Sequence, residues 1–262
     1  MGELEVLSVW DGTAHVAPIQ FVAGSTEHDW RPHPRLLDPD GRLPIEFGGF
    51  LVRGGAEVIL VDAGIGPITV GPFGGGAFLR SLAELGVQPA QVTDVVFTHL
   101  HFDHVGWASL DGGAVFPNAA YRCSRADWDH LVGADPRVTE KLDPIRDRFD
   151  LWEGDVRLLP GLEVHGAPGH TPGSVLVAVS SRADRVLLLG DVAHTPLQLL
   201  RPELPVTGDV DPELARRSRG RVTAELESSG LHAVASHFPG MRFGRLGAAE
   251  GRRHWLVDGV RC

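Results

Sequence analysis

The sequence predicts an α/β (α+β) fold in which helices flank two packed β-sheets. Apolar runs of strand length follow one another in groups, and the helical stretches between them do not alternate strictly with strands. That order favours layered sheets over a doubly wound parallel sheet. The chain has 262 residues, 43% of them hydrophobic, and no Pro/Gly/Ser-rich linker divides it. We therefore predict one domain over residues 1–262.

The N-terminal part of the chain predicts short strands, a long loop and one helix. Residues 23–46 are rich in Pro, His, Asp and Arg without any period, which predicts a loop. Loops of this length in compact domains are usually functional or mobile. A glycine-rich turn at 71–76 precedes a helix at about 77–85 that ends at Gly86. The predicted strands of this part are 4–10, 50–52, 57–61 and 93–97.

The middle of the chain predicts a helical insertion followed by strands. The insertion covers residues 124–150, and Ser124 is a suitable N-cap for its first helix. The apolar runs at 175–179 and 185–189 are separated by polar residues, which predicts a hairpin. Further short strands are predicted at 162–165 and 233–235.

One amphipathic helix is predicted near the C-terminal end. Asp211 followed by Pro212 is a typical helix start, and Gly230 is a typical helix stop. Apolar or small residues fall four apart within these limits, so we expect one buried stripe against a sheet. That stripe consists of Leu214, Ser218, Val222 and Leu226.

The charge and hydropathy of the chain argue against nucleic acid and membranes as partners. The formal net charge is -10 and no long basic run occurs, so anionic surfaces are repelled on average. No segment approaches the ~20 apolar residues of a membrane span. The N-terminus lacks the features of a signal peptide, and Cys123 and Cys262 do not suggest a disulfide framework. We expect a cytoplasmic protein.

Seven histidine and aspartate residues form a candidate metal-binding set. Four of them lie together in one segment after a predicted strand, and three follow singly, each at the end of an apolar run. His99 and His101 are separated by one residue, so they point the same way in extended backbone. A turn or helix start after them lets the adjacent Asp103 and His104 face the same cavity. Imidazole and carboxylate suit zinc, iron, manganese or cobalt. The set is His99, His101, Asp103, His104, His170, Asp191 and His237.

The pattern around these residues resembles the metallo-β-lactamase superfamily of hydrolases. His99 to His104 match the HxHxDH signature, and the three later residues match in order and approximate spacing. The resemblance covers nearly the whole chain and implies a four-layer αββα sandwich with the site at one edge of the sheets. It also implies that Asp62 supports the site. Metal-bound histidines usually need orienting partners, and we expect Asp62 and Thr171 to supply them.

The resemblance further implies a two-ion site and a hydrolytic mechanism. Two divalent ions, zinc by default, would share a bridging hydroxide that opens an ester or lactone, and Asp103 could also shuttle a proton. One ion is expected at His99, His101 and His170, the other at Asp103, His104 and His237, with Asp191 bridging them.

The branch of the superfamily depends on Asp191 and on the residue three positions later. An aspartate at 191, where common β-lactamases carry cysteine, is similar to the N-acyl-homoserine lactonases. Those lactonases place a catalytic tyrosine at the position of His194, and the Asp-x-x-His form looks more like the methyl parathion hydrolase-type group. His194 is therefore a second candidate catalytic residue, which could donate a hydrogen bond or a proton to substrate.

Several functions on this scaffold stay open. An ester or lactone hydrolase is favoured over a phosphotriesterase, a thioesterase, or a metal-centred enzyme or binding protein that does not hydrolyse its ligand. We expect a small-molecule substrate, and the resemblance implies a homodimer. The long loop and the helical insertion are the expected walls of the pocket, with Phe21, Trp30, His33, Trp107 and Phe149 as candidate lining residues.

Overall fold

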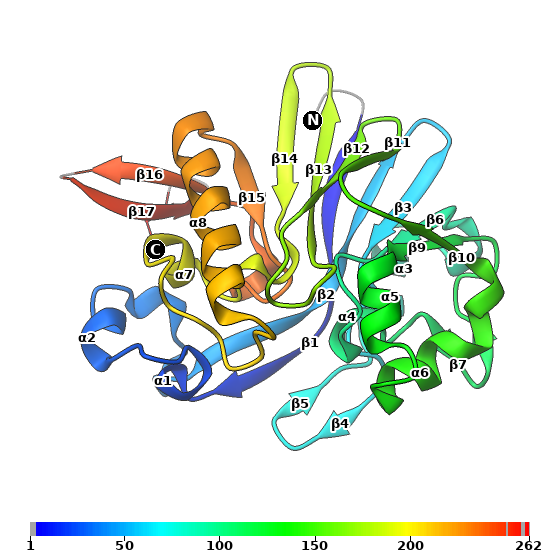
Figure 1. Cartoon of the computed structure of the whole chain (residues 1–262), viewed down its shortest axis with the longest axis horizontal. Coiled ribbons are helices and arrows are strands. Elements are labelled where there is room, and N and C mark those ends of the chain that lie inside the picture. Colours follow the sequence, from blue (N-terminus) through cyan, green and yellow to red (C-terminus); the bar gives the residue numbers. More distant parts are fainter. Residues whose placement is uncertain (1–3, 250, 258–259, 262) are drawn as a thin grey trace.

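Two β-sheets pack face to face at the centre of the protein, and helices cover the outer face of each (Figure 1). This computed structural model describes residues 4–249, 251–257 and 260–261. The layer order is helix, sheet, sheet, helix, so the predicted αββα sandwich is confirmed. Within the described residues, no helix is both long and apolar enough to span a membrane. Cys123 is buried and unpaired, and Cys262 lies outside the described residues.

The first sheet has six strands, antiparallel at one side and parallel at the other. β1 to β3 are antiparallel neighbours, whereas β3, β6, β9 and β10 run parallel. The strand order is β1 (Glu5–Val16), β2 (Leu43–Gly54), β3 (Glu57–Val61), β6 (Asp94–Val96), β9 (Ala120–Ser124) and β10 (Phe149–Trp152).

The second sheet has five strands, and its last pair is parallel. The predicted hairpin is present as β13 and β14, and β15 runs parallel to β14. The strand order is β11 (Val156–Leu159), β12 (Leu162–Gly166), β13 (Val175–Ser181), β14 (Asp184–Leu188) and β15 (His232–Val234).

Smaller elements surround the two sheets. The β16–β17 hairpin extends away from the sandwich beside α8 (Figure 1). The α-helices are α1 (Pro18–Phe21), α2 (Glu27–Trp30), α3 (Phe78–Glu84), α4 (Phe102–Val105), α5 (Arg125–Leu131), α6 (Pro136–Leu142), α7 (Pro196–Leu200) and α8 (Pro212–Ser229). Short 3-10 helices cover Pro34–Leu36, Pro89–Gln91, Asp143–Arg148, Gly190–Val192 and Pro239–Met241. The remaining strands are β4 (Thr69–Val70), β5 (Phe73–Gly74), β7 (Ser109–Leu110), β8 (Gly113–Ala114), β16 (Arg245–Ala249), β17 (Arg252–Val257) and β18 (Val260–Arg261).

The central strands contain continuous apolar runs because both of their faces are buried there. In β2, Phe50 and Val52 point between the sheets, whereas Leu51 points towards α3 and the other helices of its side. In the second sheet, Val177 points between the sheets and Leu187 packs beneath α8. Alternating side chains therefore fill two different layers of core, which explains the continuous apolar runs in the sequence.

Helix α8 confirms the predicted caps but buries a wider face than predicted. The Asp211 carboxylate accepts the backbone N–H of Leu214 at 2.9 Å, and Gly230 ends the helix with a φ of 66°. Leu214 is only partly buried, because a helix repeats every 3.6 residues and a four-residue stripe drifts across its surface. The buried face consists of Ala215, Ser218, Arg219, Val222, Thr223 and Leu226.

Two predicted boundaries were wrong. The loop predicted at 23–46 contains α2 and a 3-10 turn, and residues 43–46 already belong to β2, where Leu43 and Ile45 alternate inward against β1. The insertion at 124–150 includes the first two residues of β10, which pairs with β9. Both segments are too short for an alternating pattern to be recognised in the sequence.

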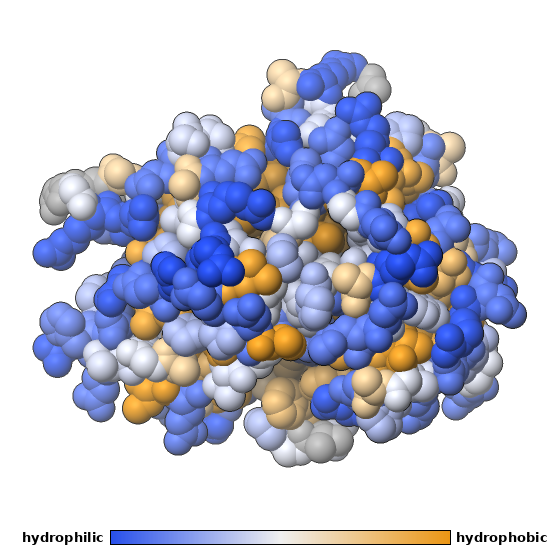
Figure 2. Space-filling view, in the orientation of Figure 1, coloured by the Kyte–Doolittle hydropathy of each residue, from blue (hydrophilic) through white to orange (hydrophobic). Residues whose placement is uncertain are grey.

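Charged side chains cover much of the surface. On the face shown in Figure 2, hydrophilic residues predominate and the hydrophobic ones form small, separate patches. Such a face is typical of a surface in contact with water, since large exposed apolar patches usually mark interfaces.

The buried carboxylate of Asp11 joins β1 to three other segments. It lies at a bulge in β1 and accepts the backbone N–H groups of Ile65, Gly66, Gly76 and Phe78, each at 2.9 Å. The indole N–H of Trp107 donates to the same carboxylate at 3.0 Å. One side chain therefore satisfies five donors of loops that the sheets do not organise.

We expect Asp11→Ala to lower the free energy of unfolding by about 3 kcal/mol or more, because buried donors lose their acceptor. Urea unfolding followed by circular dichroism measures the change. Asp40→Ala, at an exposed position, is the control and should stay within about 0.5 kcal/mol of the unsubstituted protein. Equal stability of the two variants would contradict this role of Asp11.

Candidate metal centre

The seven predicted metal-binding residues meet at one edge of the two sheets. The segment 99–104 follows β6, Asp191 follows β14, and His237 follows β15. Because β3 and β6 are parallel, and β14 and β15 are parallel, the carboxyl ends of each pair open at the same edge. His170 comes from the loop that joins β12 to β13.

Three imidazoles and one carboxylate form the first candidate position. The Nδ1 atom of His101 lies 3.1 Å from Nε2 of His99 and 2.9 Å from Nε2 of His170. The Oδ2 atom of Asp191 lies 3.4 Å from Nε2 of His99 and 3.2 Å from Nε2 of His170. All four ligand atoms lie within 4.8 Å of one another.

Asp103, His104 and His237 form the second candidate position, and their ligand atoms also lie within 4.8 Å of one another. Nε2 of His237 is 3.6 Å from the Asp103 carboxylate. Asp191 reaches this group as well, at 3.3 Å from Nε2 of His104 and 3.3 Å from Nε2 of His237. Its carboxylate therefore lies between the two groups, where a bridging ligand is expected.

The nitrogen and oxygen atoms of this cluster are better suited to coordinating divalent cations than to forming hydrogen bonds with one another. Nε2 of His104 and Oδ1 of Asp191 are buried and have no hydrogen-bond partner among the described residues. Buried polar atoms normally have a partner, and here the unpaired atoms face a common centre. Imidazole nitrogens with carboxylate oxygens are a ligand set for zinc and similar transition metals.

The histidines of the cluster differ in the direction in which their surroundings shift the pKa. Burial, assisted by His170, lowers the pKa of His101 to about 4, and burial also lowers the pKa of His194 to about 4. Burial by itself would lower the pKa of His104, but the Asp191 and Asp62 carboxylates outweigh it and raise that pKa well above its usual range. The neutral imidazoles keep a free lone pair near neutral pH, as a metal ligand requires.

Asp62 lies where the sequence predicts an orienting residue. Its carboxylate contacts Nδ1 of His104 at 2.9 Å, and it accepts the backbone N–H and hydroxyl of Thr98 at 2.8 and 2.9 Å. These bonds hold the start of the 98–104 segment and turn the His104 ring so that Nε2 faces the centre.

The hydroxyl of Thr171 bonds to residues outside the set of seven metal-binding candidates. Its hydroxyl donates instead to the carboxylate of Asp127 at 3.0 Å and lies 2.6 Å from the hydroxyl of Ser174. The predicted orienting role of Thr171 is therefore indirect, because the side chain acts on another buried residue.

The sequence reasoning missed three groups that hold the cluster. Asp209 contacts Nδ1 of His170 at 3.1 Å and is paired with the buried Arg219 at 3.3 Å. Nδ1 of His237 lies 2.7 Å from the backbone carbonyl of Glu46, and Asp127 bonds to two loops of the cluster. No spacing signal marks these residues, since each comes from a segment distant in sequence from its partner.

His194 lies inside the cluster. Its Nε2 atom is 3.1 Å from Oδ2 of Asp191, and its ring stacks on His237 with centroids 5.1 Å apart and planes 11° apart. Asp191, His194 and His237 also form a third group whose ligand atoms lie within 4.8 Å of one another. His194 is thus close enough to act on anything bound between the two candidate positions.

The predicted pocket residues divide into one that reaches the cluster and four that do not. The ring of Phe21 meets that of His194 edge to face, 5.6 Å between centroids. Trp107 and Phe149 were wrong as pocket walls: the Trp107 indole is buried against Asp11, and Phe149 packs on Phe97 in the core. Their apolar side chains stabilise the helix side of the first sheet.

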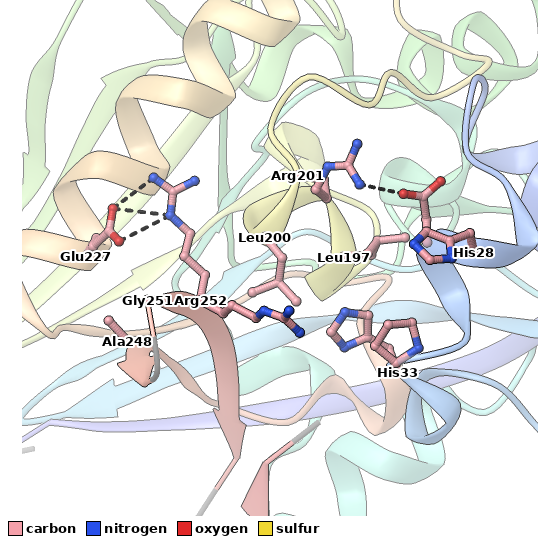
Figure 3. Close-up of a pocket in the computed structure, with 12 residues that line it drawn as sticks. His28, His33, Leu197, Leu200, Arg201, Glu227, Ala248, Gly251 and Arg252 are labelled. Carbon is pink, nitrogen blue, oxygen red and sulfur yellow. Dashed lines mark hydrogen bonds and ion pairs between the residues drawn. The ribbon is translucent and has the colours of Figure 1, made fainter.

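Trp30 lies in α2 and His33 shortly after it, and their place in a substrate pocket stays a prediction. The buried Trp30 donates its indole N–H to the Ser25 hydroxyl, which fixes the loop around α2. His33 lines a groove of about 730 Å³ that none of the seven metal-binding candidates lines. Figure 3 shows His33 and Arg252 facing each other across this groove, beside Leu200 of α7.

Aromatic residues from other elements surround the second position instead, and of these Phe47 is buried whereas Phe73 and Phe102 are half-buried. The Phe47 ring lies 5.7 Å from that of His237, and Phe73 packs 6.0 Å from Phe47 and 6.4 Å from Phe102. The guanidinium of Arg137 lies 4.1 Å from the Phe102 ring centroid. The surroundings of the cluster are therefore apolar and aromatic with one nearby cation.

Comparison with known sequences identifies the class of protein. The profile of the metallo-beta-lactamase superfamily matches residues 49–228, and the chain belongs to that superfamily. An N-acyl homoserine lactonase from Bacillus sp is 28% identical over 226 residues, covering 79% of this chain and 87% of the relative. Human metallo-beta-lactamase domain-containing protein 1 is 39% identical over 145 residues, covering 53% of this chain and 48% of that protein.

Solved structures agree with this class. The dizinc quorum-quenching lactonase AidC superposes with a TM-score of 0.88 at 23% identity, covering 99% of this chain and 96% of that one. The hydrolase AbOPH gives a TM-score of 0.86 at 25% identity, covering 98% and 95%. Together with the family match, they agree with a metal-dependent hydrolase of the metallo-beta-lactamase superfamily.

We expect the metal-free protein to take up two zinc ions per chain and to become more stable as it does so. Each site should add about 2.7 kcal/mol when free zinc is 100 times its dissociation constant. Elemental analysis gives the stoichiometry, and thermal unfolding gives the stability change. His101→Ala should lose at least one equivalent. A variant that keeps both equivalents would contradict the role of His101 as a ligand.

Proposed function

We propose that this protein is a dinuclear metal-dependent hydrolase that opens an ester or lactone of a small organic molecule. The observation that carries the proposal is the position of Asp191, whose carboxylate lies within 3.4 Å of nitrogen atoms from both ligand groups. The first ion would be held by His99, His101, His170 and Asp191, and the second by Asp103, His104, His237 and Asp191. When bound, such ions activate water and polarise a carbonyl oxygen.

The residues around this site would manage the protons of the reaction. Ring opening breaks the bond between the carbonyl carbon and the ring oxygen, and the departing oxygen needs a proton. Nε2 of His194, 3.1 Å from Asp191, is suitably placed to donate one or to bind the substrate oxygen. Asp103, at the edge of the second position and 3.6 Å from His237, is a second group that could pass a proton.

The candidate metal centre has no tyrosine near it, so His194 is the candidate for the role of the catalytic tyrosine. The chain has one tyrosine, Tyr121, and its hydroxyl is buried in the core against the carbonyl of Ala108. No tyrosine of this chain can therefore act at the site. His194 occupies the position three residues after Asp191, where the lactonases that the chain resembles carry their catalytic tyrosine.

The aromatic surroundings support a substrate with an apolar part. Phe21 contacts His194, while Phe73 and Phe102 pack against each other beside Asp103, and all three rings are half-buried. Burying an apolar chain or ring against such side chains contributes about 25 cal/mol per Å² of area removed from water. An acyl lactone offers both the reactive carbonyl and the apolar chain.

Phosphotriester hydrolysis is the second candidate function. Two observations favour it: a histidine at position 194, and aromatic rings that could hold an aryl leaving group. The same metal positions and the same proton donor would serve, since both reactions displace an oxygen from an electrophilic centre. The choice of zinc, the cytoplasmic location and a dimer stay predictions.

We expect the zinc-loaded enzyme to open a long-chain N-acyl-homoserine lactone with a kcat/KM on the order of 10⁴ M⁻¹s⁻¹ or more. Proton release in a weakly buffered solution measures the rate. His101→Ala and Asp191→Ala should be inactive and serve as blanks. Turnover no faster than these blanks, combined with hydrolysis of aryl phosphotriesters, would favour the second candidate function. Full activity of either variant would contradict the metal mechanism.

We expect His194→Phe to lower kcat by about 10²–10⁴-fold, because the departing oxygen loses its proton donor. Metal content should stay near two per chain, since the proposed ligands remain. Steady-state kinetics and elemental analysis test both statements. Loss of one equivalent in this variant would instead make His194 a ligand, and unchanged kcat would remove it from the mechanism.

A further inference from the structure

Asp127 is a buried carboxylate that the proposed reaction does not use. It lies in the first turn of α5 and is fully buried. Its Oδ2 atom accepts the backbone N–H of Leu100 at 2.9 Å and the hydroxyl of Thr171 at 3.0 Å. Its Oδ1 atom accepts the backbone N–H of Gly173 at 2.6 Å. A buried carboxylate with three donors is a specific arrangement, because its charge cannot be left without partners.

The three donors belong to two separate loops that both carry candidate ligands. Leu100 lies between His99 and His101, and Thr171 directly follows His170. Asp127 therefore connects the loop after β6 to the loop between β12 and β13. These two loops contribute the three imidazoles of the first metal position. Nε2 of His170 and Nδ1 of His101 meet between the loops at 2.9 Å, and Asp127 bonds to both loops from outside the ligand set.

The second metal position is held by different groups. His104 is oriented by Asp62 and His237 by the carbonyl of Glu46. Neither contact involves Asp127. A substitution of Asp127 should consequently change the metal affinity of the first position more than that of the second.

The backbone around Gly173 is built to let Asp127 approach. A Cβ atom at Gly173 would lie 2.6 Å from the backbone nitrogen of Asp127 and 2.7 Å from its Oδ1 atom. Any side chain there would collide with the first turn of α5. The close contact explains why a glycine follows His170 by three residues, as a packing requirement between the loop and the helix.

We propose that Asp127 is a positioning residue for the first metal position: it sets the distance between the His99–His101 pair and His170 and thereby the affinity of that position. The inference rests on the proposed two-metal site. Thr171 acts as part of the same device, which accounts for its presence beside His170 although its hydroxyl faces away from the cluster.

The test is the metal affinity of Asp127→Asn in the full chain. The amide preserves the volume but replaces one acceptor oxygen with a donor, so the backbone N–H of either Leu100 or Gly173 must lose its acceptor. Competition with a chromophoric zinc chelator gives two dissociation constants per chain. We expect one of them to rise by about 10- to 100-fold and the other to stay unchanged. Asp129→Asn, at an exposed position of the same helix, should change neither.

A pair of variants at Thr171 keeps the test decisive if Asp127→Asn folds poorly. Thr171→Val removes the hydroxyl donor and should weaken the same single equivalent, whereas Thr171→Ser keeps the hydroxyl and should restore it. Circular dichroism checks that both variants are folded. A general structural role would lower the unfolding temperature without separating the two dissociation constants.

The outcomes for the two proposals are distinct. Suppose that the unsubstituted protein binds two zinc ions tightly. If Asp127→Asn and Thr171→Val then weaken both ions equally, or weaken neither, this inference alone is overturned. An unsubstituted protein that binds no zinc would overturn the proposed function and this inference with it.

Discussion

One carboxylate surrounded by imidazoles is the interaction on which the rest of this structure depends. Asp191 lies within 3.4 Å of nitrogen atoms from five histidines, supplied by four loops at one edge of the sandwich. Those histidines hold its pKa well below the usual range, although burial opposes them. So many polar atoms without other partners are costly to bury, and cations between them are the arrangement that would satisfy all of them.

A set of buried aspartates makes this concentration of ligands possible. Asp11, Asp62, Asp127 and Asp209 each accept donors from segments far apart in sequence, and none of them belongs to the candidate ligand set. Loops lack the regular backbone hydrogen bonds that hold strands in place. Carboxylates that accept several hydrogen bonds hold these loops instead. Ligand geometry is then decided by these contacts as much as by the strands, since metal-bound histidines need partners for their second nitrogen.

The apolar layers stabilise the fold, whereas the polar edge of the sheets forms the candidate metal centre. Valine and leucine residues that alternate between layers hold the two sheets and their helices together, and they leave the loops free to vary. Aromatic residues from β2, β5, α1 and α4 then reach over the cluster from different directions. The site thus combines a rigid base with an apolar rim, which suits a substrate that has a reactive carbonyl and a hydrophobic part.

The sequence by itself determined the fold class, the hairpin of β13 and β14, the caps of α8 and the seven residues of the cluster, because each leaves a local signal of period, cap or spacing. Only the tertiary structure decided which residues surround that cluster. Trp107 is buried in the core and Phe149 packs against it, whereas Phe47, Phe73 and Phe102 lie beside the site. Asp127 and Asp209 were equally hidden, since a contact between distant segments leaves no pattern along the chain.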